Sequence, residues 1–232
     1  MSKNNLKSSL VILTRNEITG MRALIKKIPF QAVDETLVID YHSTDGTKEF
    51  IKKNRIKLIN QIQPGRGEAF RLAAAKAKGD LLVFFSPDGN EDPQDIPRLL
   101  QLLKQGNDLV IASRFLPQSR NEEDDQFFKF RAWANQGFTF LANLFFHGRL
   151  TDSINGYRAI TKTAFKRLKL DASGYAIEFQ MSMRALKLKY KIAEIPTIEG
   201  NRIGGQSGSK AIPTGYLFLF ILFKEIFQCR KQ

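Results

Sequence analysis

The chain has 232 residues, of which 43% are hydrophobic, and a formal net charge of +13. This length and apolar content allow one substantial α/β domain, alone or with a small appendage. Because Cys229 is the single cysteine, a disulfide framework within the chain is excluded and a reducing compartment is expected. The excess positive charge favours anionic partners such as phosphorylated substrates, nucleic acid or an anionic membrane face, and solvated lysine-rich helix faces are the alternative.

The first 112 residues alternate short β-rich runs with segments of helical periodicity. We expect Thr44 or Asp45 to cap the second helix and Gly79 to end the third. The alternation predicts an α/β fold with a mostly parallel sheet and helices on both faces, in which ligands bind beyond the carboxyl ends of the strands. Strands are predicted at 10–13, 35–40, 56–60, 80–85 and 108–114, and helices at 17–28, 44–54, 66–79 and 93–106.

The second half of the chain has a different pattern. After a polar loop, a long amphipathic helix is predicted, and the chain turns back through Gly156. The predicted segments are a loop at 116–126, helices at 127–147, 177–189 and 215–227, a strand at 190–196 and a glycine-rich basic loop at 201–210.

The helix predicted at 215–227 is aromatic, and for two turns it is apolar on almost every side. It could pack on the protein core, lie in a bilayer interface or form a dimer contact, and basic residues beside aromatic ones favour the interface. No stretch reaches the about 18 apolar residues of a membrane span, and the N-terminus lacks a signal-peptide core. We therefore expect a cytoplasmic protein at the inner face of the membrane, attached peripherally or monotopically.

An oxygen-rich turn follows the buried strand 80–85. It contains Asp88, Asn90 and Glu91, which can supply the oxygen ligands that Mg²⁺ prefers. The alternative is that these residues only cap a surface turn before the next helix. Elsewhere, Asp40 ends a strand, where it can accept hydrogen bonds from a base or ribose or cap its own turn.

Seven segments resemble family 2 glycosyltransferases in order and spacing, and the branch they resemble most is the dolichol- or polyprenyl-phosphate sugar synthases. The resemblance implies a GT-A fold, which is Rossmann-like, over residues 1–212, with the aromatic helix at 213–232. It also implies a nucleotide-sugar donor at the strand ends, in the form of a UDP or GDP sugar. The segments are LVILTRNE, VIDYHSTDGT, GRGEAFRLAAAKAKGDLLVFFSPDG, ASRF, DSINGYR, EIP and RIGGQS.

The resemblance carries over donor-binding residues. Tyr41 and His42 replace a second Asp and a small residue of the family pattern, and Tyr41 could stack on the base instead. Arg66 opens a helix after a glycine, where arginine and backbone N–H groups can hold phosphate. The implied donor-binding residues are Thr14, Glu17, Asp40, Tyr41, Arg66, Gly67 and Arg114.

The family's Asp-x-Asp motif, whose second acid binds Mg²⁺ or Mn²⁺ on the donor diphosphate, corresponds to Ser86-Pro87-Asp88. Asp88 therefore remains as a metal ligand, and Asn90 lies where the polyprenyl-phosphate branch has a glutamine ligand. The implied catalytic residues are Asp88, Asp152, Arg131 and Arg202.

The acceptor determines whether a general base is needed. Asp152 matches the family's acceptor-side acid, and Glu178 is a second candidate base for a hydroxyl acceptor. A lipid phosphate is already a nucleophilic anion and needs no strong base.

These features predict an inverting glycosyltransferase that moves a sugar from a nucleoside-diphosphate sugar to a polyprenyl phosphate. The alternatives are transfer to a glycan or small-molecule hydroxyl, and a non-catalytic nucleotide-sugar-binding homologue. Nucleic-acid binding is not expected, because the chain has no recognisable motif for it beyond its charge.

Overall fold

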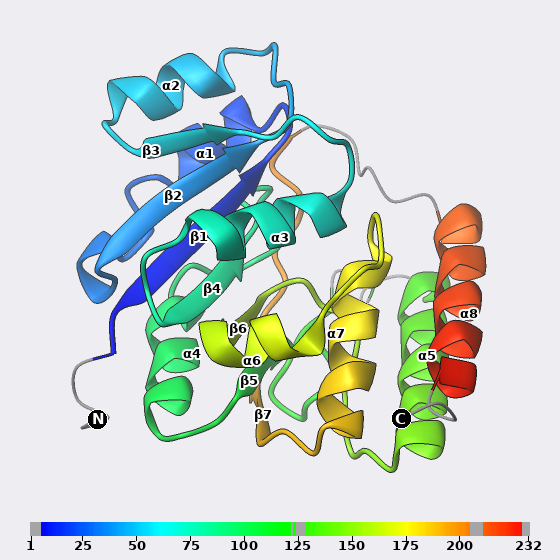
Figure 1. Ribbon diagram of the computed structural model, residues 1–232. Helices are drawn as coiled ribbons and strands as arrows, with labels where there is room; N and C mark the ends of the chain where they lie inside the picture. Colours follow the sequence, from blue (N-terminus) through cyan, green and yellow to red (C-terminus); the bar gives the residue numbers. More distant parts are fainter. Residues whose placement is uncertain (1–5, 122, 124–128, 205–210, 229–232) are drawn as a thin grey trace.

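The computed structural model describes residues 6–121, 123, 129–204 and 211–228 (Figure 1). Seven strands form one sheet in the order β3-β2-β1-β4-β6-β5-β7. The strands are β1 (Ser8–Thr14), β2 (Glu35–Asp40), β3 (Lys57–Asn60), β4 (Leu81–Phe85), β5 (Leu109–Ser113), β6 (Arg158–Thr161) and β7 (Ile192–Pro196). The helices are α1 (Ile18–Leu24), the 3₁₀ turn η2 (Phe30–Ala32), α2 (Thr47–Lys53), α3 (Arg66–Lys76), α4 (Asp95–Lys104), α5 (Phe130–Phe146), α6 (Lys162–Leu168), α7 (Ala176–Lys187) and α8 (Ala211–Gln228).

The predicted α/β fold with a mostly parallel sheet is confirmed, and β6 is the exception to parallel pairing. It runs antiparallel to both β4 and β5, pairing Arg158 with Phe84 and with Ile111. The amino end of β6 therefore lies at the same edge of the sheet as the carboxyl ends of β4 and β5. The loop before β6 reaches this edge together with the loops that follow the parallel strands.

Helices cover both faces of the sheet, so the central strands are buried on both sides. Along β1, Val11 and Leu13 join one apolar cluster and Leu10 and Ile12 join the other, as the two-residue period of a strand requires. In the first cluster, the Phe70 ring of α3 stacks on Phe84 of β4 with centroids 4.0 Å apart. Burial on both faces explains why the strands read as nearly continuous apolar runs.

Two predicted helix caps differ from the structure. Helix α2 begins at Thr47, after Gly46, because the Asp45 carboxylate binds the backbone N–H groups of Thr47 and Ile18, both at 3.0 Å. Helix α3 ends at Lys76, before Gly79. Gly79 is required for another reason, since a Cβ there would lie 2.7 Å from the Ser9 hydroxyl oxygen.

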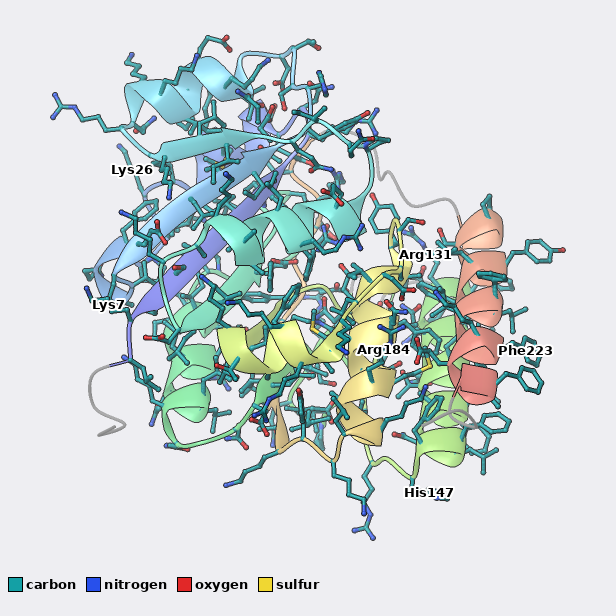
Figure 2. The ribbon with its side chains drawn as sticks, in the orientation of Figure 1. Lys7, Lys26, Arg131, His147, Arg184 and Phe223 are labelled. Atoms are coloured by element: carbon teal, nitrogen blue, oxygen red, sulfur yellow. The ribbon has the colours of Figure 1, made fainter. Side chains whose placement is uncertain are left out.

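Helix α8 lies beside α5 and α7 (Figure 1). Its Glu225 is only 1% exposed and binds Arg184 at 2.7 Å and Lys187 at 2.6 Å, both on α7. The outward sides of α5 and α8 carry large exposed apolar residues, which we call the apolar face; Figure 2 shows Phe223 pointing away from the protein. The apolar face comprises Phe130, Trp133, Phe140, Leu144, Phe145, Tyr216, Leu219, Phe220, Phe223 and Phe227.

None of the helices in the described part of the chain is both long enough and apolar enough to cross a membrane.

Candidate active site

Two adjoining cavities open at the edge where the parallel strands end. The first, of about 630 Å³, lies over the ends of β1 and β2 and the start of α3. The second, of about 380 Å³, lies between the loop before β6 and helices α5, α7 and α8. Residues lining both cavities mark their junction: Arg66, Ser86, Asp88, Tyr175 and Arg202.

The first cavity contains several of the predicted donor-binding residues. Thr14 and Glu17 line it from the end of β1, and Tyr41 lines it from the end of β2. The Arg15 guanidinium lies 5.3 Å from the centroid of the Tyr41 ring. An aromatic ring next to cationic groups suits a nucleotide, whose base can stack and whose phosphates are anionic.

Two other predicted donor residues lie behind the cavity wall. Asp40 is fully buried and accepts hydrogen bonds from the Thr14 hydroxyl at 2.9 Å and from the Ser43 N–H at 3.1 Å. It therefore caps its own turn and orients Thr14, and it is absent from the lining of both cavities. A Cβ on Gly67 would lie 2.2 Å from the Ala172 carbonyl oxygen, so this glycine allows α3 to pack closely.

The oxygen-rich turn is tied to the segment after β7. Asp88 accepts a hydrogen bond from Arg202 at 2.7 Å, and the same guanidinium binds Glu17 at 2.7 Å. The Asn90 side-chain amide donates to the Gly200 carbonyl at 2.9 Å. Burial raises the pKa of Glu17 to about 7, against the opposing effect of Arg202. Arg202 thus links carboxylates from two different strand ends.

The turn can hold a divalent cation only with help from a ligand. Within the described residues, no group of three or more His, Cys, Asp or Glu side chains could hold a metal ion. Asp88 is the carboxylate shared by both cavities. Because Mg²⁺ is often bound by one or two carboxylates plus substrate phosphates, Asp88 fits such an ion together with a diphosphate.

Arg66 crosses the junction of the cavities. Its Nε donates to Glu178 Oε1, and its two terminal nitrogens each lie 3.3 Å from the Ser86 hydroxyl. Glu178 is 2% exposed, and its Oε2 is buried without a hydrogen-bond partner. Burial opposes the charge on Arg66, but the carboxylates of Glu178 and Glu91 outweigh it and raise the pKa of Arg66.

Glu91 lies beside the same junction. It accepts a hydrogen bond from the Ser86 N–H at 2.6 Å. Burial and the charge of Asp88 raise the pKa of Glu91 well above its usual range.

Asp152, a predicted catalytic residue, lies outside both linings. It is fully buried and binds the Arg114 guanidinium through two contacts of 2.6 and 3.0 Å and the Arg114 backbone N–H at 3.3 Å. It also accepts from the backbone N–H groups of Ile154 at 3.2 Å and Asn155 at 3.0 Å. Burial alone would raise the pKa of Asp152, but Arg114 holds it below its usual value.

Both arginines and carboxylates line the second cavity, and its side toward α5 and α8 is aromatic. Arg114 and Arg131 line it, and Figure 2 shows Arg131 at the upper end of α5. Phe130, Phe138 and Phe218 line its aromatic side.

Sequence reasoning missed Tyr175, which lines both cavities and lies 5.9 Å from the Arg66 guanidinium. It belongs to none of the segments that carry the family resemblance, so no local signal marked it. Residues 205–210 of the predicted glycine-rich basic loop, and Cys229, fall outside the described residues.

Comparison with known proteins gives consistent matches. The profile of the family described as "Glycosyl transferase family 2" matches residues 9–169. The chain is 29% identical over 212 residues to the undecaprenyl-phosphate mannosyltransferase of Micrococcus luteus, covering 85% of each chain. It is 26% identical over 216 residues to the dolichol-phosphate mannosyltransferase of Pyrococcus furiosus, covering 88% of this chain and 60% of that one.

A third relative, the glycosyltransferase AglJ of Haloferax volcanii, is 28% identical over 186 residues, covering 79% of this chain. The chain spans about 60% of the length of AglJ and of the Pyrococcus protein.

Among solved structures, the chain resembles glucosyl-3-phosphoglycerate synthase from Mycobacterium tuberculosis, in complex with Mn²⁺, UDP and phosphoglyceric acid. The TM-score is 0.76 at 22% identity, over 97% of this chain and 80% of that one. At this identity the match supports the fold.

Proposed function

Because the chain belongs to glycosyltransferase family 2, we propose that it transfers a sugar from a nucleoside-diphosphate sugar to a polyprenyl phosphate, with inversion at the anomeric carbon. The observation that carries this proposal is the pair of cavities that meet at Arg66, Asp88 and Arg202. A donor in one cavity and an acceptor in the other would bring the reacting atoms to this junction.

The first cavity is proposed for the donor. The ring of Tyr41 offers a surface for the base, and the diphosphate would extend toward Asp88 and Arg202. Arginine N–H groups stabilise the charge that develops on a departing diphosphate. A Mg²⁺ or Mn²⁺ ion, held by Asp88 and the diphosphate, would supply further positive charge.

The second cavity is proposed for the acceptor. Arg114 lines it from the end of β5 and Arg131 from the first turn of α5, beside phenylalanine rings of α5 and α8. Arginines next to aromatic rings suit a molecule with a phosphate head and an apolar tail. A phosphate oxygen can attack the anomeric carbon without a general base.

The apolar face supports a membrane surface as the place of the reaction. It lies on α5 and α8, the two helices that supply Phe130, Phe138 and Phe218 to the acceptor cavity. Amphipathic helices with aromatic residues on one side bind in the bilayer interface. A long lipid tail could then pass from the bilayer into the cavity.

A hydroxyl acceptor is the second candidate, and one observation favours it. Glu178 Oε2 is buried without a partner, and Glu178 lines the second cavity. A carboxylate oxygen in that position can accept the proton of an attacking hydroxyl.

Binding and transfer experiments test these proposals separately. Calorimetric titration of UDP, GDP and their sugar conjugates, with and without Mn²⁺, tests the donor site in the wild type and in Asp88→Ala. Loss of metal-dependent binding in the variant is the expected result. Nucleotide binding with no transfer to any acceptor would favour the non-catalytic alternative.

Transfer assays then compare a polyprenyl phosphate in micelles with hydroxyl acceptors, in the wild type and in Glu178→Gln. Lipid-phosphate transfer that survives Glu178→Gln supports the first candidate. Hydroxyl transfer that falls by about 100-fold or more in Glu178→Gln, the usual range for a general base, supports the second.

A further inference from the structure

Position 86 is unusual because a serine stands where the resemblance places the first acid of the Asp-x-Asp motif. In the structure, the Ser86 hydroxyl faces Arg66, with Nη1 and Nη2 both at 3.3 Å. These separations are longer than typical N–H···O hydrogen bonds of about 2.9–3.0 Å. The outer edge of the guanidinium therefore faces a neutral and weakly bound partner.

The position of Arg66 is fixed from several sides. Glu178 holds its Nε, and its guanidinium carbon lies 5.5 Å from the centroid of the Phe70 ring. A Cβ on Gly156 would lie 2.2 Å from Nη2, so glycine at this position makes room for the side chain. Arg66 is thus held in place from the inner side, while its outer edge points into the junction of the two cavities.

An acid at position 86 would change the charge at this edge. A carboxylate opposite two guanidinium nitrogens forms a paired, charge-assisted contact, which is far stronger than a bond to a hydroxyl. Such a pair would occupy Nη1 and Nη2 of Arg66, whose Nε already pairs with Glu178. Serine avoids this, so Nη1 and Nη2 can exchange the weakly bound Ser86 hydroxyl for phosphate oxygens.

We propose that Arg66 supplies the positive charge that binds the donor diphosphate, and that Ser86 leaves Nη1 and Nη2 of Arg66 available for it. Nucleotide binding therefore has a component that does not depend on a divalent metal ion. This inference rests on the proposed donor site. When the bond between the anomeric carbon and the diphosphate oxygen breaks, the electron pair stays on that oxygen, and the Arg66 N–H groups stabilise its charge. A metal ion held by Asp88 would supply further positive charge and would not replace Arg66.

Calorimetric titration of UDP and GDP, in EDTA and in Mn²⁺, tests the proposal. For the nucleotide that binds, the wild type should retain measurable affinity in EDTA. Ser86→Asp should bind at least ten-fold more weakly in EDTA than Ser86→Asn, which has a similar size without the charge. Mn²⁺ should restore binding to Ser86→Asp, because the new carboxylate can also serve as a metal ligand.

Arg66 itself is tested with Arg66→Gln, which should lose at least ten-fold in affinity in EDTA. Because that change leaves Glu178 buried without its cation, the double variant Arg66→Gln/Glu178→Gln repeats the measurement with the pair removed. Arg71→Gln is the matched control, since Arg71 lies on the same helix, pairs with Glu68 and is absent from both linings.

The outcomes separate this inference from the proposed function. Nucleotide binding that requires metal, or that is unchanged in both Arg66 variants, overturns the role of Arg66 and leaves the donor site standing. Equal affinity of Ser86→Asp and Ser86→Asn in EDTA overturns the role of Ser86. Absence of nucleotide binding under every condition overturns the donor site and this inference together.

Discussion

Replacement of Asp152 with alanine distinguishes an architectural role from a chemical one. The change removes a fully buried carboxylate that binds the Arg114 guanidinium twice and accepts from three backbone N–H groups. Loss of one partner of a buried ion pair costs about 3–5 kcal/mol. Because Glu199 lies 3.7 Å from Arg114 and retains part of the compensation, we expect the lower limit, about 3 kcal/mol.

For a chain of this size, each kcal/mol corresponds to about 2–4 °C, so the melting temperature should fall by about 6–12 °C. The stabilisation that Asp152 provides should depend on pH, in a direction that its pKa determines. Arg114 lowers the pKa of Asp152 in the folded state. The stabilisation is therefore present above the unfolded pKa, about 3.9, and is lost as the pH falls through the folded value.

Urea unfolding of the wild type and Asp152→Ala at pH 7 measures the difference directly. Glu68→Gln is the control, because Glu68 and Arg71 form a pair in which each side chain is 34% exposed; its cost should stay below about 1 kcal/mol. A variant as stable as the wild type that has lost sugar transfer would refute the reasoning and place Asp152 among the groups that touch substrate.

Three further results are expected. Burial raises the pKa of Glu17 to about 7, so this carboxyl gains negative charge beside the first cavity as the pH rises from 6 to 8; calorimetric affinity for a nucleotide sugar should fall over that range and stay flat in Glu17→Gln. Glu225→Ala should lower the free energy of unfolding by about 3 kcal/mol, measured in urea, because Arg184 and Lys187 lose their buried partner. Phe220→Glu/Phe223→Glu should abolish co-sedimentation with anionic lipid vesicles while leaving the melting temperature within about 2 °C, because both rings are exposed; vesicle binding equal to wild type would contradict the membrane assignment of the apolar face.

The sequence was sufficient for the part of the fold that depends on local patterns. Apolar runs and helical periodicity located the parallel strands and their helices, and the strand-end rule placed Asp88, Thr14 and Glu17 at one edge. The antiparallel strand β6 was not predicted, because its four residues follow a turn and carry no alternation that distinguishes them. Its place between β4 and β5 is determined by pairing with strands far away in the chain.

The direction in which a side chain points also could not be predicted from the sequence. Asp40 and Asp88 both follow buried strands, yet Asp40 turns back to Thr14 and Ser43 while Asp88 lines both cavities. The contact between Arg202 and Asp88 joins residues 114 positions apart. Spacing along a sequence carries no information on such contacts, which depend on how the loop after β7 returns to the sheet.

Strand β6 also has a consequence for the order in which the chain folds. The β1–β2 and β2–β3 pairs join residues close in sequence, as with Ser9 and Glu35. By contrast, β6 joins Leu82 to Ile160 and β7 joins Leu109 to Ile192. Closing longer loops costs more entropy before contacts repay it, and distant pairings form slowly. We therefore expect β1, β2 and β3 to pair early and the centre of the sheet to close late, so that the edge beside the first cavity takes shape before the edge beside the second.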